Sequence, residues 1–208
     1  MSTKRTIPTF RYLSWWRIEH LVHKLAEKVG KEEPTLILGM SRGGAIPTTL
    51  LIKELGYQGP HNLVLVSYYK GVAKTKKEPF VHIPRHISLR GEKVLLVDDV
   101  ADTGHSLHHT VRAIKEKGVG SVTTATLHYK PWSIIQPDVY CEKTEDWIIY
   151  PWEVQETIAD LSSDTELSED LRDALVKGGL PPSLLELCLS RLKTLGTTRK
   201  VGGSTEAG

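Results

Sequence analysis

Strand-like and helix-like segments alternate along the first two thirds of the chain, and this alternation limits the possible folds more than any other feature. Four runs are apolar or rich in β-branched residues, as buried strands are: 35–40, 62–69, 94–97 and 121–129. Three segments repeat apolar residues at helical spacing: 15–29, 48–56 and 104–117. Parallel strands need a long connection between them, usually a helix, so this order predicts an α/β fold with a mostly parallel twisted sheet flanked by helices. Two shorter runs, 138–143 and 146–150, are expected to form small strands.

The composition changes after about residue 155, so we expect a sheet-bearing domain over 1–155 and a helical extension over 156–208. Ser168 is expected to cap one helix of the extension, and Pro182 to open a second. The second helix has four residues at the spacing of a packed seam: Leu185, Cys188, Leu192 and Leu195. We expect this seam to pack on its own chain rather than in a coiled coil, and the last dozen residues to be a disordered tail.

Basic and acidic residues nearly balance, with 27 Lys and Arg against 25 Asp and Glu and a net charge of +2. This balance gives no electrostatic case for binding nucleic acid or a membrane surface. Cys141 and Cys188 lack the paired spacing of a disulfide framework and resemble reduced thiols. The N-terminus has no apolar signal core, and no stretch is long enough to span a bilayer. We therefore expect a cytoplasmic protein without nucleic-acid or membrane partners.

The stretch VLLVDDVADTGHSL, residues 94–107, places three carboxylates at the end of an expected strand. Asp98 and Asp99 only accept hydrogen bonds when they are ionised, so they suit the hydroxyls of a sugar diol. They also suit Mg²⁺, which prefers few carboxylates together with ligand oxygens and water. Positive charge on a sugar ring, as develops in glycosyl transfer, would be stabilised beside them as well.

The turn ADTGHS, residues 101–106, follows these acids and opens a helix. Backbone N–H groups at a helix N-terminus, together with the hydroxyls of Thr103 and Ser106, form a site for an anion, and Gly104 lets the backbone approach closely. This arrangement suits a phosphate monoester, whereas the spacing of a Walker phosphate loop is absent. A second glycine turn, SRGG at 41–44, follows the first expected strand. Both turns are therefore expected at one crevice beyond the carboxyl ends of the strands.

The segment VLLVDDVADTGHS closely resembles the signature of the type I phosphoribosyltransferases, which bind phosphoribosyl pyrophosphate (PRPP). The resemblance implies their fold, with a small hood region, and Mg²⁺ near Asp99 held mainly through ligand oxygens and water. The SRGG turn resembles the family's pyrophosphate loop, in which one peptide bond is often cis. The residues that would bind PRPP are Ser41, Arg42, Gly43, Asp98, Asp99, Ala101, Asp102, Thr103, Gly104, His105 and Ser106.

Three further segments resemble the xanthine–guanine branch of the purine phosphoribosyltransferases: YLSWWRIEHLVHKLAEKV, LGMSRGGAIP and DWIIYPWE. This resemblance runs from about Tyr12 to Glu153 and implies Mg²⁺-dependent transfer of a phosphoribosyl group to a purine in nucleotide salvage. Lys130 ends the fourth expected strand and favours a 6-oxopurine, since an ammonium group donates to a 6-oxo oxygen but cannot accept from a 6-amino group. Leaving a buried donor unpaired costs about 1–3 kcal/mol, which is roughly tenfold to hundredfold discrimination.

The resemblance also implies the remaining site residues. Asp102 matches the acceptor for the proton on purine nitrogen seven, which would make it the catalytic residue. Trp147 offers a flat face for stacking on the base, worth on the order of 1–3 kcal/mol. The main chain at Ile148 and the carboxylate of Glu153 match positions near the base in the family. Tyr68 resembles a residue of the lid, which we expect over about 68–82 because a ribosyl cation must be shielded from water.

Two alternatives stay open on the sequence alone: a PRPP-binding regulator on the same fold, and a phosphoribosyltransferase for another nucleobase. The lack of a basic face weighs against a regulator. His105 and His109 share a helical face, but no separate carboxylate or cysteine completes a tetrahedral metal set, so we expect them to be helix-surface residues. Because the family is generally dimeric or tetrameric, the resemblance also implies a homo-oligomer.

Overall fold

The computed structural model describes residues 7–30, 32–67, 79–162 and 166–202, with side chains to residue 194. The chain divides into two compact units. We call residues 16–145 the sheet unit, and the residues up to 15 together with those from 146 onwards the terminal unit. None of the helices in the described ranges has the length and apolarity that crossing a bilayer requires.

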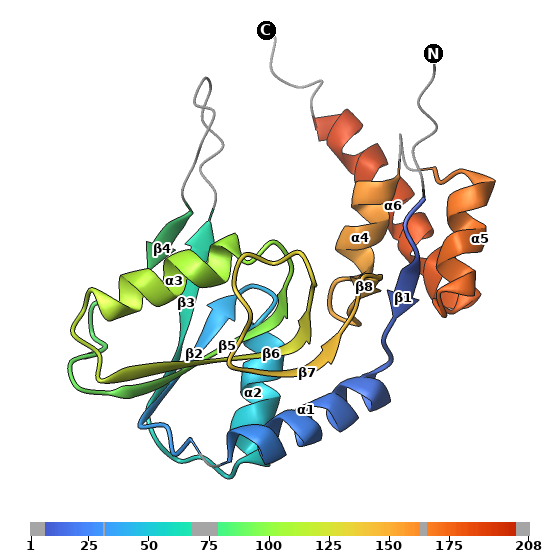
Figure 1. Cartoon of the computed structure of the whole chain (residues 1–208). Coiled ribbons are helices and arrows are strands. Elements are labelled where there is room, and N and C mark those ends of the chain that lie inside the picture. Colours follow the sequence, from blue (N-terminus) through green and yellow to red (C-terminus); the bar gives the residue numbers. More distant parts are fainter. Residues whose placement is uncertain (1–6, 31, 68–78, 163–165, 203–208) are drawn as a thin grey trace, which may run out of the picture. The chain divides into compact units, whose positions relative to one another are not determined.

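The sheet unit contains a six-stranded sheet in the order β4-β3-β2-β5-β6-β7 (Figure 1). Its strands are β2 (Leu36–Ser41), β3 (His61–Ser67), β4 (Phe80–His82), β5 (Lys93–Ala101), β6 (Ser121–Tyr129) and β7 (Val139–Lys143). Neighbouring strands are parallel throughout, except that β3 and β4 are antiparallel. The mostly parallel sheet predicted from the alternation of segments is therefore confirmed.

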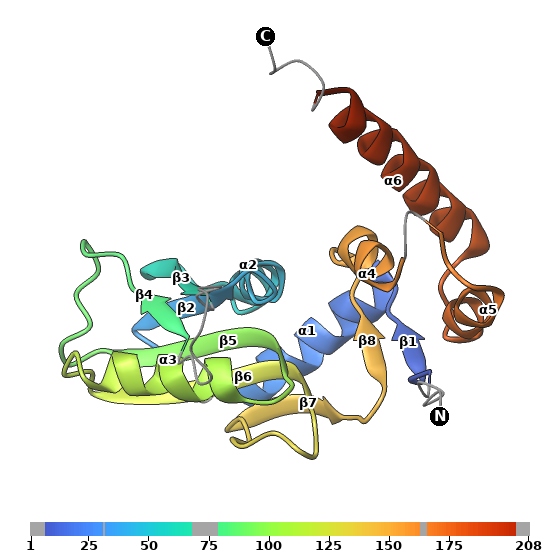
Figure 2. The ribbon, with the colours of Figure 1, turned by 90° about the horizontal axis from the view of Figure 1, so that it is seen from above.

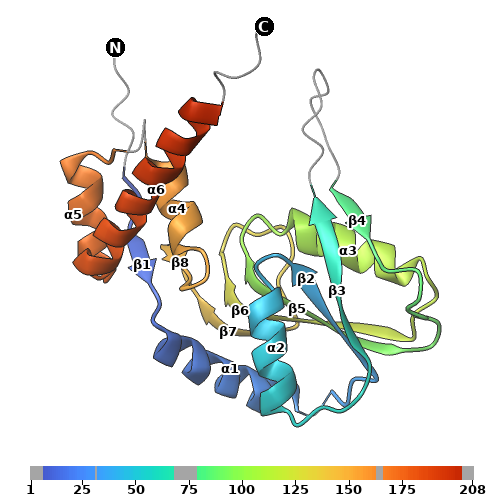
Figure 3. The same cartoon turned by 180° about the vertical axis from the view of Figure 1, so that it is seen from behind.

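Three helices flank this sheet: α1 (Trp15–Val29), α2 (Ala45–Glu54) and α3 (His105–Lys115). Helix α3 lies on one face, and α1 and α2 lie on the other, as the two views in Figure 2 and Figure 3 show. The apolar positions that predicted α1 form its buried stripe, which includes Ile18, Leu21 and Leu25. Helices on both faces explain why the central strands are apolar along their length rather than alternating.

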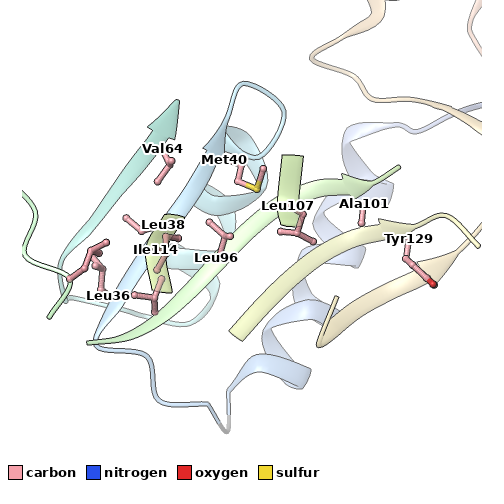
Figure 4. Packing of buried hydrophobic residues seen from close by; sticks show 11 residues of the cluster. Leu36, Leu38, Met40, Val64, Leu96, Ala101, Leu107, Ile114 and Tyr129 are labelled. Carbon is pink, nitrogen blue, oxygen red and sulfur yellow. The ribbon is translucent and has the colours of Figure 1, made fainter. Parts of the chain in front are cut away.

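The core on the α3 side is built from every second residue of the central strands (Figure 4). Leu36, Leu38 and Met40 of β2 belong to one buried cluster with Leu107 and Ile114 of α3. The intervening strand residues, such as Ile37 and Leu95, are fully buried as well. Burying one such leucine or isoleucine side chain stabilises the fold by about 1.5–3 kcal/mol.

Two elements of the sheet unit are longer than the sequence predicted. Strand β5 was expected over 94–97, but it continues to Ala101 because its last residues still pair with β6, with Asp98 opposite Thr126 and Ala101 opposite Tyr129. The two acids therefore lie within the strand, not after it. Helix α2 was expected from residue 48 but begins at Ala45, since Pro47 falls in the first turn, where its missing N–H is not needed.

In the terminal unit, a strand near the N-terminus pairs with a strand from the last third of the chain. Strand β1 (Phe10–Tyr12) is parallel to β8 (Trp147–Ile149), and three helices follow: α4 (Val154–Leu161), α5 (Glu169–Lys177) and α6 (Pro182–Gly202). Neither β1 nor α4 was predicted, and both are short. Ser168 caps α5 as predicted, since its side chain accepts a hydrogen bond from the Leu171 N–H.

A separate hydrophobic core holds the terminal unit together. Leu185 and Cys188 of α6 are buried in one cluster with Phe10 and Ile158, and Leu192 packs against that cluster. The prediction that the α6 seam packs on its own chain is thus confirmed for these residues. Helix α6 continues to Gly202, whereas the disordered tail was expected from residue 197. No glycine or proline interrupts residues 197–201, which explains why the helix can continue there.

Candidate functional site

The carboxyl ends of β2, β5 and β6 lie at one edge of the sheet because these strands are adjacent and parallel. The turn after β2 carries Arg42 and Gly43, the turn after β5 carries Asp102, and Lys130 directly follows β6. The sheet topology therefore brings together three segments that lie far apart in the sequence. Ligands of open parallel sheets generally bind at such an edge.

The glycine turn after β2 packs directly against the end of β5. A Cβ atom added to Gly43 would overlap the carboxylate of Asp99, with the Asp99 Cγ only 2.7 Å away. A Cβ added to Gly44 would lie 2.7 Å from the carbonyl oxygen of Val97 and 2.9 Å from the Asp98 Cα. Glycine is required at Gly44 because two main chains approach so closely there, and at Gly43 because any side chain would displace the Asp99 carboxylate. The peptide bond between Ser41 and Arg42 is cis.

The two acids at the end of β5 are fixed by main-chain hydrogen bonds. The Asp99 N–H donates to Oδ1 of Asp98 at 3.0 Å, and the Val100 N–H donates to Oδ1 of Asp99 at 2.7 Å. Asp99 is only 6% exposed, whereas Asp98 is half-buried. A buried carboxylate that receives charge-assisted hydrogen bonds is held more firmly than an exposed one, so Asp99 presents its negative charge from a defined position.

The turn after β5 leads into α3 through Gly104. This residue is the N-cap of α3 and has φ of +79°, a left-handed conformation that side chains rarely allow. The turn places residues 101–106 at the N-terminus of an 11-residue helix, where unpaired N–H groups and the helix dipole favour an anion. The structure thus contains the helix N-terminus that the sequence predicted as a phosphate site.

Lys130 is nearly buried, with 6% of its surface exposed. Its backbone N–H donates to the Ala101 carbonyl at 3.0 Å, which attaches the residue to the turn after β5. Its Nζ lies 5.4 Å from the centre of the Trp132 ring, within the range of a cation–π interaction. A nearly buried ammonium beside the predicted phosphate turn supports a role in ligand recognition.

Trp132 contacts this site, although the sequence did not single it out. Its indole Nε1 donates a hydrogen bond of 3.0 Å to Oδ1 of Asp102. The one available signal was its position two residues after Lys130, in HYKPW. A tryptophan just beyond a strand is too common in cores and on surfaces to be assigned from that position alone.

The three predicted base contacts outside the sheet unit lie in the terminal unit. Trp147 is the first residue of β8 and is 50% exposed. Its ring packs edge-on against that of Phe10, with the ring centroids 6.4 Å apart. Ile148 is buried in the same strand, and Glu153 is the N-cap residue of α4. The neighbouring Trp152 stacks on Tyr150, with the two ring centroids 4.8 Å apart. Tyr68 and most of the expected lid lie outside the described residues.

Comparison with known proteins identifies the family. Residues 11–158 match the phosphoribosyl transferase domain. The xanthine-guanine phosphoribosyltransferase of Gluconobacter oxydans is 28% identical over 159 residues, which cover 74% of this chain and 91% of that protein.

Solved structures agree with this match. The purine phosphoribosyltransferase of Pyrococcus horikoshii is 38% identical, with a TM-score of 0.64 over 69% of this chain and 94% of that chain. The Helicobacter pylori xanthine-guanine-hypoxanthine phosphoribosyltransferase shares the fold at 19% identity, with a TM-score of 0.62 over 73% of this chain and 98% of that one. The chain therefore belongs to the phosphoribosyl transferase domain family, as an enzyme of its type I purine branch.

Proposed function

We propose that this enzyme transfers the phosphoribosyl group of PRPP to a 6-oxopurine, namely guanine, xanthine or hypoxanthine, with Mg²⁺ as cofactor. The products are the nucleoside monophosphate and pyrophosphate, as in purine salvage. One observation carries the proposal: the glycine turn, the paired acids and Lys130 lie at the same edge of the sheet. Relatives named for xanthine and guanine support the choice of base.

The proposed PRPP site uses both turns at this edge. The 5-phosphate is bound by residues 101–106, where Thr103, Gly104, His105 and Ser106 supply backbone N–H groups or hydroxyls. Asp98 and Asp99 accept hydrogen bonds from the ribose diol. The pyrophosphate leaves toward Ser41, Arg42 and Gly43, where main-chain groups and the Arg42 cation stabilise its charge.

The donor set at the end of β5 fits Mg²⁺. Nowhere in the described ranges do three or more His, Cys, Asp or Glu side chains form a metal cluster. Mg²⁺, however, usually takes only one or two protein carboxylates and completes its shell with water and phosphate oxygens. Asp99, with Asp98 beside it, would hold the ion in this way, and the ion would supply charge neutralisation for the pyrophosphate.

The proposed base site explains the selection of 6-oxopurines. The Lys130 ammonium donates a hydrogen bond to the 6-oxo oxygen, and adenine has no acceptor at that position. Asp102 accepts the proton from nitrogen seven, which raises the nucleophilicity of nitrogen nine as it attacks the ribosyl carbon. The family resemblance further implies stacking on Trp147, a main-chain contact at Ile148 and a contact from Glu153. These roles, and that of Tyr68 in the lid, stay predictions.

A panel of bases tests the proposal. Purified protein is incubated with Mg²⁺, PRPP and, separately, guanine, xanthine, hypoxanthine, adenine, uracil and orotate, and pyrophosphate release is followed. Turnover with at least one 6-oxopurine and none with adenine is expected. PRPP binding without turnover of any base would favour a regulator, and turnover of a pyrimidine or adenine would favour another branch of the family.

Replacing Asp102 with Asn tests the catalytic role separately. The change keeps the size of the side chain but removes the proton acceptor. Turnover is expected to fall about a hundredfold or more, within the range of general base catalysis, while the Kd for PRPP changes little. Equal loss of turnover and of PRPP binding would refute the assigned role.

The proposed assembly follows from the same resemblance, whereas the proposed location follows from the unpaired cysteines. We propose a cytoplasmic homo-oligomer, either a dimer or a tetramer. Light scattering of the full chain would measure its mass in solution, and a monomer at micromolar concentration would refute the proposed assembly.

A further inference from the structure

Three successive hydrogen bonds join the segment after β6 to the turn after β5. The Lys130 N–H donates to the Ala101 carbonyl at 3.0 Å, and the Ile134 N–H donates to the Thr103 carbonyl at 3.0 Å. Between them, the Trp132 indole donates to the Asp102 carboxylate at 3.0 Å. Residues 130, 132 and 134 thus contact residues 101, 102 and 103 in order. We call residues 130–134 the strap.

The strap holds the predicted phosphate turn mainly through its backbone. A Cβ atom added to Gly104 would overlap Oγ of Ser133 in the strap and would lie 2.9 Å from Cγ2 of Ile135, which follows it, so the strap passes directly over the start of α3. Two of its three bonds involve no side chain, and a substitution at Trp132 therefore leaves them in place. The third bond is different, because it reaches a carboxylate that is otherwise exposed to solvent.

The same indole contacts two groups that the reaction needs. Its N–H holds Oδ1 of Asp102, and its ring lies 5.4 Å from the Lys130 ammonium. An indole N–H can only donate, so it fits the ionised, proton-accepting form of the carboxylate and occupies Oδ1 but not Oδ2. The ring face attracts the lysine cation through its quadrupole.

We propose that Trp132 is a positioning residue for the transfer reaction, which holds the Asp102 carboxylate through its N–H and the Lys130 ammonium through its ring. This inference rests on the proposed function of Asp102 and Lys130 at the purine. The acceptor for nitrogen seven and the donor to the 6-oxo oxygen serve neighbouring atoms of one base. A single rigid side chain that contacts both fixes their spacing, and misplacement by about 1 Å can cost on the order of a hundredfold in rate.

Two substitutions separate the two contacts. Trp132→Phe keeps a ring beside Lys130 and removes the N–H, so kcat is expected to fall about tenfold while the KM for PRPP stays within twofold. Trp132→Leu removes both contacts, so it should also raise the KM for the purine severalfold. Trp16→Phe is the matched control, because Trp16 is 72% exposed on α1 and outside the site; it should leave all constants unchanged.

A double substitution tests whether the effect passes through Asp102. Adding Trp132→Phe to Asp102→Ala should cause no further loss of kcat, since the partner of the N–H is already absent. A purely structural role would instead raise the KM for PRPP and lower kcat in both backgrounds. That result, or a Trp132→Phe enzyme with kcat within twofold of the wild type, would overturn the proposal.

A measurement without substrate keeps this proposal distinct from the proposed function. In a ¹⁵N–¹H spectrum, the Trp132 indole resonance should shift in Asp102→Ala while the Trp16 resonance does not. An unshifted Trp132 resonance would overturn the positioning role even in an active enzyme. A shifted resonance in a protein that turns over no purine would refute the proposed function but leave the Trp132–Asp102 bond established.

Discussion

Replacing Gly43 with alanine tests how closely the glycine turn must approach the acids. The added Cβ would lie 2.7 Å from Cγ of Asp99, closer than such atoms come in folded proteins. Asp99 is 6% exposed, and its carboxylate accepts the 2.7 Å bond from the Val100 N–H, so it cannot turn away without cost. Losing a hydrogen bond to a charged group costs about 1.5–3 kcal/mol.

This cost sets the expected effect on ligand binding. If Asp99 holds the ribose diol, a displacement worth about 1.5–3 kcal/mol weakens PRPP binding roughly tenfold to hundredfold. Isothermal titration of the Gly43→Ala protein with PRPP in the presence of Mg²⁺ measures the change. Urea unfolding of the same protein records any accompanying loss of stability.

A second glycine supplies the control. Gly56 follows α2, has φ of +60°, and has no atoms within 4 Å of an added Cβ. Gly56→Ala should therefore lower the free energy of unfolding by about 1–2 kcal/mol through its left-handed backbone without changing the Kd for PRPP. A Gly43→Ala protein with wild-type affinity for PRPP, or an equal loss of affinity in both variants, would refute the reasoning.

Three further predictions concern other contacts. Lys130→Met removes the ammonium but keeps a long apolar side chain, so kcat/KM for a 6-oxopurine should fall about tenfold to hundredfold while the Kd for PRPP changes little; steady-state rates and titration with PRPP measure this, and an equal loss of both would contradict it. Burial raises the pKa of the Cys141 thiol from 9.0 to about 11. The unfolded chain therefore loses this proton at a lower pH than the folded chain, and the free energy of unfolding should fall as the pH rises from 9 to 11. The loss is roughly 2–3 kcal/mol and should be absent from Cys141→Ala when urea unfolding is compared at pH 8 and pH 11. Ser168→Ala removes the cap of α5 and should lower the free energy of unfolding by about 1 kcal/mol, whereas an unchanged urea midpoint would show that the 3.4 Å bond to the Leu171 N–H contributes nothing.

The central fold was predictable because its signals are local. The β-branched run at 121–129 forms β6 with the same bounds, and Ser168 caps α5 as its position indicated. The prediction was less accurate where tertiary contacts decide the outcome. Strand β5 continues through Asp98 and Asp99, residues with low strand propensity, because β6 offers partners to Asp98, Val100 and Ala101. The short strand β1 depends in the same way on β8.

The sequence by itself determined the order of strands and helices and the identity of the motif residues, because hydrophobic spacing and turn glycines act over a few neighbouring positions. Only the tertiary structure decided that Gly43 meets Asp99 and that Trp132 binds Asp102, since these contacts arise where β2 and β6 lie on either side of β5. Residues 30 or more positions apart become neighbours there through strand pairing, and no local pattern records which side chains will then be within reach of one another.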